Sequence, residues 1–384
     1  MLVELCVGGG GRFTAIGPIS LRMILFSVAL VMSIPLLIKK KSFPCPFWIL
    51  SIAFVLMILV GTLVGWANHN SNELIYQDVK PLCYFFVLPF FYQVIDEAMI
   101  LNTIRIIKTA SISMAAVFIA LLVLIHSGII PFPAFYRATM IFEELFYRGE
   151  VTFFYKGFLF FGIGAIFFYF TERSGSKKYF FFLLVTAIML SVTRGLLLSL
   201  VLSLSVYFLV IKTYWRAAVV VLFAVTIVVW GSDFILSASR LVDAKQNNKG
   251  YHEADPTLLG DRDYSDNGRV TQAKEVWRKV SFSSAIMGHG FGAGTPSRPI
   301  HMEISYLEIF HKQGLIGLIF WGLLASMIFI QYRQAVPSPA TNGFVYSSLF
   351  IFIESLTNQY INNPIGMSLL LLSLVCLYKL KMKK

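Results

Sequence analysis

The sequence predicts an all-α protein that crosses a membrane many times. Of its 384 residues, 57% are hydrophobic, 15% are aromatic and only 14% are charged, whereas soluble domains have about 25% charged residues. The mean hydropathy is +0.74. The apolar residues form blocks close to the ~20 residues that a helix needs to cross the hydrocarbon core. This composition excludes a soluble enzyme, a disordered chain, a fibrous repeat and a disulfide scaffold.

The apolar blocks predict eleven transmembrane helices. They cover residues 19–38, 47–66, 81–95, 103–126, 151–171, 179–193, 195–211, 216–236, 309–331, 343–361 and 364–380. The break at Thr193, Arg194 and Gly195 predicts two helices joined by a very tight turn. The alternative is a single long broken helix, which would invert the topology of everything after it.

Basic residues predict the orientation. If Lys39, Lys40 and Lys41 lie in the cytoplasm, the other large groups of basic residues fall on the same side. The short outer loops then hold only four basic residues, Lys80, Arg137, Arg148 and Arg194. By the positive-inside rule, the N-terminus lies outside and the C-terminus inside. The net charge of +12 is therefore a topology signal and does not indicate nucleic-acid binding.

No cleavable signal peptide is expected in 1–16, which has neither a basic start nor a long apolar run.

The predicted topology divides the chain into three parts. Residues 1–236 form an N-terminal membrane bundle of about eight helices, 237–302 a large outer loop, and 303–384 about three C-terminal membrane helices. The loop mixes acidic and basic residues in nearly equal number, which is typical of a folded cap rather than a basic tail. Short helices are expected in it at 269–280 and 300–311.

Five cationic side chains are candidate ligands for an anionic substrate such as a lipid phosphate or pyrophosphate. A guanidinium between two apolar helices is costly, so Arg194 is a functional candidate, with interfacial snorkelling as the alternative. Arg269 and Arg278 lie nine positions apart in a presumed helix, about half a turn out of phase, and a solvated helix face is the alternative for both. Lys156 and Arg148 flank the outer end of the fifth predicted span, and Lys156 is equally compatible with snorkelling.

His301 and Glu303 lie just before an apolar segment at the outer membrane boundary. Histidine exchanges protons near neutral pH, so His301 is a candidate general base, although a lone histidine is more often structural.

No protein metal site is expected. The acidic residues at 261–266 lack the glycine position and closing glutamate of a calcium loop, and the four cysteines show no ligand spacing. The glycine-rich segment 288–294 is interpreted as a flexible loop.

Four stretches resemble the superfamily of bacterial O-antigen polymerases and O-antigen ligases. They are GGGGRFTAIGPISLRMILF at 8–26, SVTRGLLLSLVLSL at 191–204, GRVTQAKEVWRKVSFSSAIMGHGFGAG at 268–294 and HMEISYLEIFHKQGLIGLIFWG at 301–322. The resemblance covers essentially the whole chain. Members of this superfamily usually have one more transmembrane helix and both chain ends in the cytoplasm. A first helix missing from this sequence would explain that difference.

The resemblance implies glycosyl transfer at the periplasmic face of the inner membrane, from a glycan on undecaprenyl pyrophosphate. Arg194 and Arg269 would stabilise the pyrophosphate leaving group without a metal or cofactor, by electrostatics. His301 would accept the proton of the attacking hydroxyl, a role worth roughly 10²–10⁴ in rate. Glu303 would bind sugar hydroxyls, and Tyr306, Arg278, Lys156 and Arg148 are further substrate-binding candidates.

The polymerase branch, in which the acceptor is a second lipid-linked repeat unit, is favoured over the ligase branch, in which it is lipid A–core. A flippase or other transporter is less favoured, because transporters place ionisable residues near the bilayer midplane and here Arg22 is the main such residue. The expected partners are the lipid-linked glycan and the bilayer, with a chain-length regulator and a flippase of the same pathway as further candidates.

Overall fold

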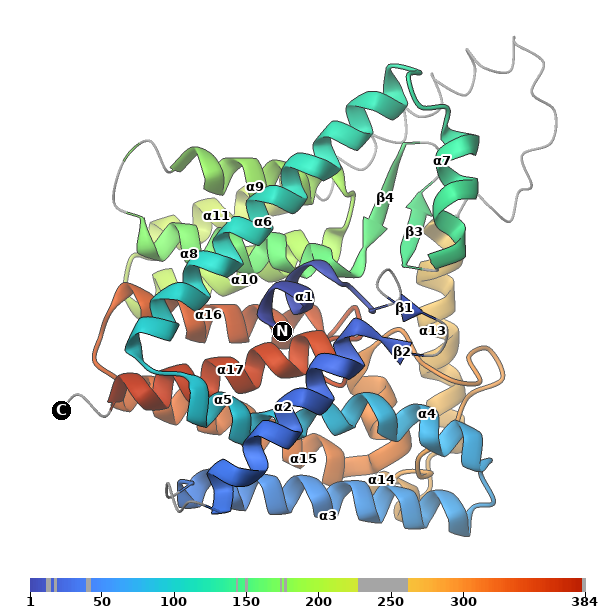
Figure 1. The fold of residues 1–384 in the computed structure, drawn as a ribbon. Helices are drawn as coiled ribbons and strands as arrows, with labels where there is room; N and C mark the ends of the chain where they lie inside the picture. Colours follow the sequence, from blue (N-terminus) through green and yellow to red (C-terminus); the bar gives the residue numbers. More distant parts are fainter. Residues whose placement is uncertain are drawn as a thin grey trace, which may run out of the picture. The chain divides into compact units, whose positions relative to one another are not determined.

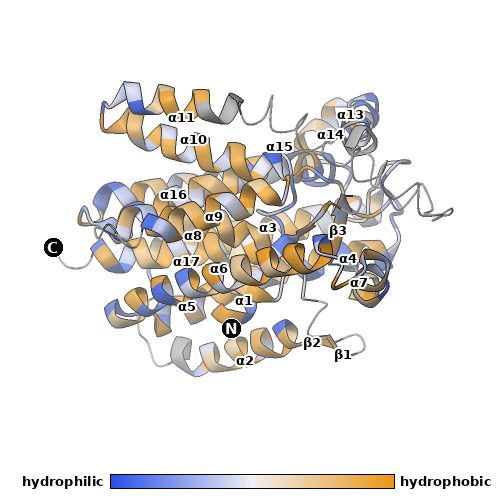
Figure 2. Cartoon of the chain, turned by 90° about the horizontal axis from the view of Figure 1, so that it is seen from above, coloured by the Kyte–Doolittle hydropathy of each residue, from blue (hydrophilic) through white to orange (hydrophobic). Residues whose placement is uncertain are grey.

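The protein is a helical membrane protein, as predicted. The structure, a computed structural model, describes residues 1–11, 15–16, 19–38, 43–142, 144–148, 151–172, 175, 178–226 and 262–381. Within these residues, four helices are long and apolar enough to cross a membrane: α3 (Cys45–Ala67), α6 (Glu97–His126), α15 (Ser305–Gln334) and α17 (Pro364–Lys381). Figure 2 shows the hydrophobic colour over most of the length of helices such as α2 and α10.

The described chain forms two compact units. The first contains Arg22–Thr103 and Asp266–Lys384 together with Met1, and the second contains Leu2–Leu21 and Ile104–Ser265. Figure 1 shows the elements of each unit in the colours of the sequence. Helix α6 begins in the first unit and continues in the second.

The first unit is built around helix α17. This helix is apolar on every side and its residues 365–377 are buried, which is typical of a helix at the centre of a bundle. It packs against its neighbours η2, α5, α15 and α16. The other elements of this unit are α2 (Leu21–Ile38), α4 (Asn72–Leu82), η2 (Cys83–Val87), α5 (Leu88–Val94), α13 (Arg262–Lys279), α14 (Phe282–Met287) and α16 (Pro339–Glu354).

Three predictions in the first unit are corrected. The span at 81–95 is not one helix but the end of α4 followed by η2 and α5, because Pro81 and Pro89 lack the N–H groups that a continuous helix needs. The helix expected at 343–361 ends at Glu354. The helix expected from residue 300 begins at Ser305.

The late start of α15 has a local cause. The carbonyl of Ile300 accepts a hydrogen bond from the Lys312 ammonium (2.7 Å), and the N–H of Glu303 donates to the Gln272 side chain (3.1 Å). The backbone before Ser305 is therefore paired with side chains instead of with a helical turn. Of the predicted outer loop, 237–261 lies outside the described residues. The helix expected at 269–280 is confirmed as the C-terminal part of α13.

The second unit is built around helix α8 (Leu159–Thr171), whose residues 159–168 are all buried. It packs against α9 (Lys178–Leu190) and α10 (Arg194–Val210). The other elements of this unit are α1 (Leu2–Val7), β1 (Ala15–Ile16), β2 (Ile19–Ser20), α7 (Phe132–Thr139), η3 (Met140–Phe142), β3 (Leu145–Arg148), β4 (Thr152–Tyr155), η4 (Lys156–Phe158) and α11 (Tyr214–Thr226).

The tight turn between α9 and α10 is confirmed. The ring of Tyr169 lies 6.0 Å from that of Phe181, near the start of α9, and 6.1 Å from that of Tyr207, near the end of α10. In one continuous helix Phe181 and Tyr207 would be separated by roughly 39 Å, at 1.5 Å per residue. The two helices are therefore antiparallel, and the single broken helix is excluded.

The fifth predicted span is wrong at its start. Residues 152–155 form strand β4, which pairs with β3 in an antiparallel hairpin, and α8 begins only at Leu159. Aromatic and β-branched residues favour a strand. The Phe153 ring lies 5.2 Å from the Phe118 ring of α6, centroid to centroid. The segment is therefore apolar because the hairpin packs against α6.

Candidate active site

Three buried ionisable side chains meet in the first unit. The Nζ of Lys312 lies 2.6 Å from Oδ1 of Asp78 and 2.7 Å from Oε1 of Glu308. Their side chains are 3%, 5% and 5% exposed, respectively. A buried charge is tolerated only when it is paired and hydrogen-bonded. We call Asp78, Glu308 and Lys312 the buried ion cluster.

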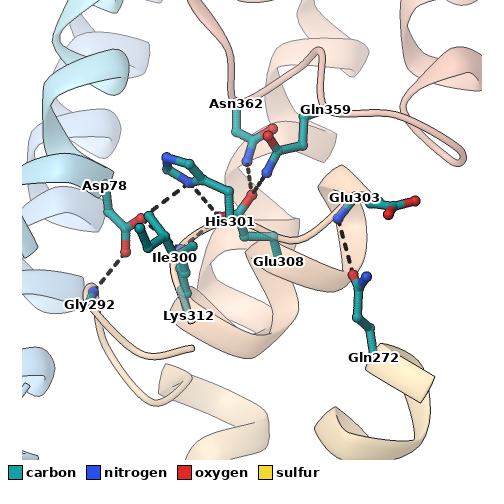
Figure 3. Close-up of polar contacts among 10 residues, drawn as sticks. All are labelled: Asp78, Gln272, Gly292, Ile300, His301, Glu303, Glu308, Lys312, Gln359 and Asn362. Atoms are coloured by element: carbon teal, nitrogen blue, oxygen red, sulfur yellow. Dashed lines mark hydrogen bonds and ion pairs between the residues drawn. The ribbon is translucent and has the colours of Figure 1, made fainter. Parts of the chain in front are cut away.

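The cluster joins elements that are distant in the sequence (Figure 3). Glu308 and Lys312 are four residues apart on α15, and this spacing puts both on one face of the helix. Asp78 comes from α4. Burial raises the pKa of the Asp78 carboxyl, and the Lys312 ammonium offsets part of this increase.

The oxygens that point away from Lys312 also have partners. Oδ2 of Asp78 accepts the N–H of Gly292 (2.7 Å). Oε2 of Glu308 accepts hydrogen bonds from the side-chain amides of Gln359 and Asn362, the latter at 2.8 Å. Both amides lie in the connection between α16 and α17, so a further segment of the chain fixes the Glu308 carboxylate.

His301 lies over the buried ion cluster and is partly exposed to solvent. Its Nδ1 is 3.3 Å from Oε1 of Glu308 and 3.7 Å from Oδ1 of Asp78, while its side chain is 45% exposed. Figure 3 shows the imidazole with Nδ1 toward the two carboxylates. The arrangement can hold a proton on Nδ1 and present Nε2 as a base.

The donor atoms of Asp78, His301 and Glu308 lie within 4.8 Å of one another, the spacing of metal ligands. However, Lys312 donates to the same oxygens, Oδ1 and Oε1, that face the imidazole. An ammonium thus stands where a cation bound by these carboxylates would lie. The residues present fit a lysine counter-ion better than a metal ion.

The glycine-rich segment 288–294 supports Asp78. It forms a loop, as predicted, but hydrogen bonds fix it. The N–H of Phe291 donates to the Gly61 carbonyl of α3 (2.9 Å), and the Asn70 amide donates to the carbonyls of His289 (3.1 Å) and Phe291 (2.9 Å). The loop is therefore not the flexible segment predicted, because its closely spaced glycines let the backbone approach α3 and direct the Gly292 N–H at Asp78.

Two predicted residues, Arg269 and Glu303, form an ion pair, and Glu303 lies two positions after His301 in the sequence. Oε2 of Glu303 is 3.0 Å from Nε of Arg269 on α13, and Oε1 is 2.7 Å from Nη2 of Arg298. Both arginines are partly exposed, at 30% and 46% of their side-chain surface. Glu303 thus holds two guanidinium groups next to the loop that carries His301.

The other candidates of the first unit lie elsewhere. Arg278 is exposed near the end of α13. Tyr306 is half-buried, and its hydroxyl donates to the Phe352 carbonyl of α16 (2.9 Å). This hydrogen bond fixes the first turn of α15, two residues before Glu308.

The remaining predicted cations belong to the second unit. Arg194 is exposed at the first position of α10. Arg148 pairs with Thr152 across the β3–β4 hairpin, and the Thr152 hydroxyl donates to the Leu190 carbonyl (2.8 Å), at the α9–α10 turn. Lys156 is half-buried, with its Nζ 6.0 Å from the Phe146 ring. The hairpin thus brings the backbone of Arg148 to the helix turn that carries Arg194.

Sequence reasoning missed Asp78, Glu308 and Lys312, and with them Gln359 and Asn362. A signal for two of them was present. Glu308 and Lys312 are ionisable residues at helical spacing beside an apolar span, and such residues are rare and usually paired. Asp78 gave no local signal, because its partner is far away in the sequence.

Comparisons with known proteins agree with the sequence analysis. Residues 179–322 match a family described as O-antigen ligase. The chain is 27% identical over 382 residues to a protein of Shigella flexneri named O-antigen polymerase, in an alignment that covers 95% of this chain and 90% of that protein. These findings confirm that the chain resembles, along nearly its whole length, the superfamily of O-antigen polymerases and O-antigen ligases.

Proposed function

We propose that this protein is an O-antigen polymerase, a membrane glycosyltransferase that joins lipid-linked oligosaccharide repeat units. The observation that carries the proposal is the similarity to a polymerase over 95% of the chain. An exposed imidazole over a buried ion cluster supports it chemically, because glycosyl transfer needs a group that accepts the proton of the attacking hydroxyl.

In the proposed reaction, a sugar hydroxyl of one repeat unit attacks the anomeric carbon of a second glycan on undecaprenyl pyrophosphate. The bond from that carbon to the pyrophosphate oxygen breaks, and its electron pair leaves with the pyrophosphate. His301 takes the hydroxyl proton on Nε2. Arg269 and Arg194 stabilise the charge on the leaving pyrophosphate, as guanidinium groups hold phosphates bidentately.

The other candidate residues have supporting parts in this proposal. Glu303 keeps Arg269 and Arg298 oriented, which its two ion pairs support, and contacts to sugar hydroxyls remain a prediction for it. Substrate contacts of Arg278, Lys156, Arg148 and Tyr306 remain predictions as well.

The topology is part of the proposal. We infer eleven membrane spans in the bacterial inner membrane, of which the third consists of η2 and α5 and the fifth begins at Leu159. We further infer a periplasmic loop over 237–302 between the membrane domains 1–236 and 303–384, and a cytoplasmic C-terminus. The distribution of basic residues supports this orientation. The substrate is then a lipid-linked glycan at the periplasmic face, and a chain-length regulator and a flippase are the proposed partners.

The ligase is the second candidate, because the family matched by residues 179–322 is described by that activity. A lipopolysaccharide gel from a deletion strain separates the two activities. A polymerase deletion leaves lipid A–core with a single repeat unit, since one unit can still be ligated. A ligase deletion leaves bare core and accumulates lipid-linked polymer. An unchanged ladder would contradict both, and a transporter would then be reconsidered.

Complementation of the deletion strain tests the residues. We expect wild type to restore the ladder, and His301→Ala, Arg194→Ala and Arg269→Ala to shorten or abolish it at normal membrane levels. Wild-type ladders in both arginine variants would contradict the pyrophosphate role. Arg22→Ala tests the transporter alternative, because it removes a buried cation of α2. We expect this variant to leave the ladder length unchanged.

A further inference from the structure

We propose that Glu308 is the positioning residue of His301. Its carboxylate accepts a hydrogen bond from the Nδ1–H of the imidazole, so that Nε2 faces the acceptor hydroxyl. Lys312 and Asp78 determine the net charge beneath the imidazole. The inference rests on the proposed glycosyl transfer. It gives the buried ion cluster a role in the reaction, which the sequence did not predict.

The geometry makes Glu308 a fixed acceptor. Its Oε1 lies 3.3 Å from Nδ1 of His301, and its Oε2 is held by Gln359 and Asn362. Asp78 is 3.7 Å from the same ring nitrogen, beyond ordinary hydrogen-bond distance. A carboxylate held from three sides fixes the tautomer of the histidine that it faces.

The charges of the cluster support the same role. Two carboxylates and one ammonium leave one net negative charge beneath the imidazole. That charge stabilises the imidazolium that forms when His301 accepts a proton. Among the described residues, other charged groups around this loop include Arg269 and Arg298, both paired with Glu303, and Glu275, which accepts hydrogen bonds from Ser297. His301 is 45% exposed, so solvent screens these charges and the effect of Glu308 is largely orientational.

The proton balance of the step is complete. The hydroxyl proton moves to Nε2, the oxygen–carbon bond forms, and the pyrophosphate leaves with the electron pair of the broken bond. Nδ1 keeps its proton and its contact with Glu308 throughout. The exposed imidazolium then releases the Nε2 proton to water, which restores the neutral base.

A double-mutant cycle tests the proposal on the full-length protein in lipid nanodiscs, with undecaprenyl-pyrophosphate-linked repeat units as substrate. The variants are His301→Ala, Glu308→Gln and the double variant. Glu354→Gln is the matched control, because Glu354 is also buried but accepts its hydrogen bonds from Asn358 and Thr357. Initial rates of all variants are measured under the same conditions.

We expect Glu308→Gln to lower the rate about 10–100-fold, the usual effect of losing a residue that orients a functional side chain. Glu308→Gln adds no further loss once His301 is alanine, Glu308→Asp recovers part of the rate, and Glu354→Gln keeps the wild-type rate. Equal losses with and without His301 would overturn the proposal.

Two readouts keep this result separate from the proposed function. Transfer to lipid A–core without polymer formation would show that the protein is a ligase. The double-mutant cycle would then be measured on that transfer reaction. Ring-nitrogen NMR of ¹⁵N-histidine-labelled protein needs no turnover. We expect His301 to be protonated on Nδ1 in wild type and to become a mixture of tautomers in Glu308→Gln; a mixture already present in wild type would contradict the positioning role.

Discussion

Lys312 and Asp78 are 234 positions apart in the sequence, yet the Nζ of the lysine lies 2.6 Å from Oδ1 of the aspartate. This ion pair ties α4 to α15 within the first unit. Because both side chains are buried, each charge depends on the other for compensation. Loss of either partner would therefore leave an uncompensated buried charge.

Removal of the lysine alone should be strongly destabilising. Lys312→Met leaves Asp78 and Glu308 as two buried carboxylates without their counter-ion, a change that costs about 3–5 kcal/mol. The double variant Lys312→Met/Asp78→Asn keeps one net negative charge and should recover much of the loss. Thermal unfolding of the detergent-solubilised protein measures both. Additive losses in the double variant would show that the pair is not coupled.

The glycine-rich segment 288–294 should tolerate no side chain at Gly290. Its φ is +80°, and a Cβ there would lie 2.1 Å from the backbone nitrogen of Gly65 on α3. Overpacking and backbone strain each cost about 1–3 kcal/mol, so Gly290→Ala should lower stability by at least about 2 kcal/mol and reduce the length of the glycan ladder. Gly322→Ala is the control, because a Cβ there meets nothing within 4 Å. A normal melting temperature for Gly290→Ala would contradict the packing described.

His289 should make stability depend on pH. Burial lowers the pKa of its imidazole, and Lys279 lowers it further. A lowered pKa means that the folded state favours neutral histidine. The stabilisation is therefore present above the unfolded-state pKa of about 6.5 and is lost as the pH falls through the folded-state value. We expect the melting temperature of wild type to fall below pH ~6.5 and that of His289→Gln to fall less. Exposed His69 is the control, and His69→Asn should follow the wild-type curve.

The α9–α10 turn should be improved by glycine. Val192 has a φ of +52°, a left-handed conformation that costs an L-residue roughly 1–2 kcal/mol. Val192→Gly removes this cost and adds a smaller entropic one, for a net gain of up to about 1 kcal/mol. Val201→Gly, at a buried position of α10, should instead destabilise. A lower melting temperature for Val192→Gly would show that the valine side chain contributes more by packing than its backbone costs.

Local patterns in the sequence determined the class of the protein and much of its helical content. Apolar blocks predicted the long helices, because the length of a span and its hydropathy are properties of consecutive residues. The polar break before Arg194 predicted the α9–α10 turn for the same reason. The motifs around Arg194, Arg269 and His301 predicted the resemblance to the superfamily that the comparisons also find.

The tertiary structure alone decided which charges meet. Apolar residues at 81–95 and 151–158 were interpreted as membrane helix, but prolines and a β-hairpin determine their structure. Lys312 became the counter-ion of Asp78, and Glu308 the neighbour of His301, only when α4, α15 and the α16–α17 connection came together. Hydropathy and helical periodicity describe neighbours along the chain, whereas the pairing of buried charges depends on contacts between distant segments.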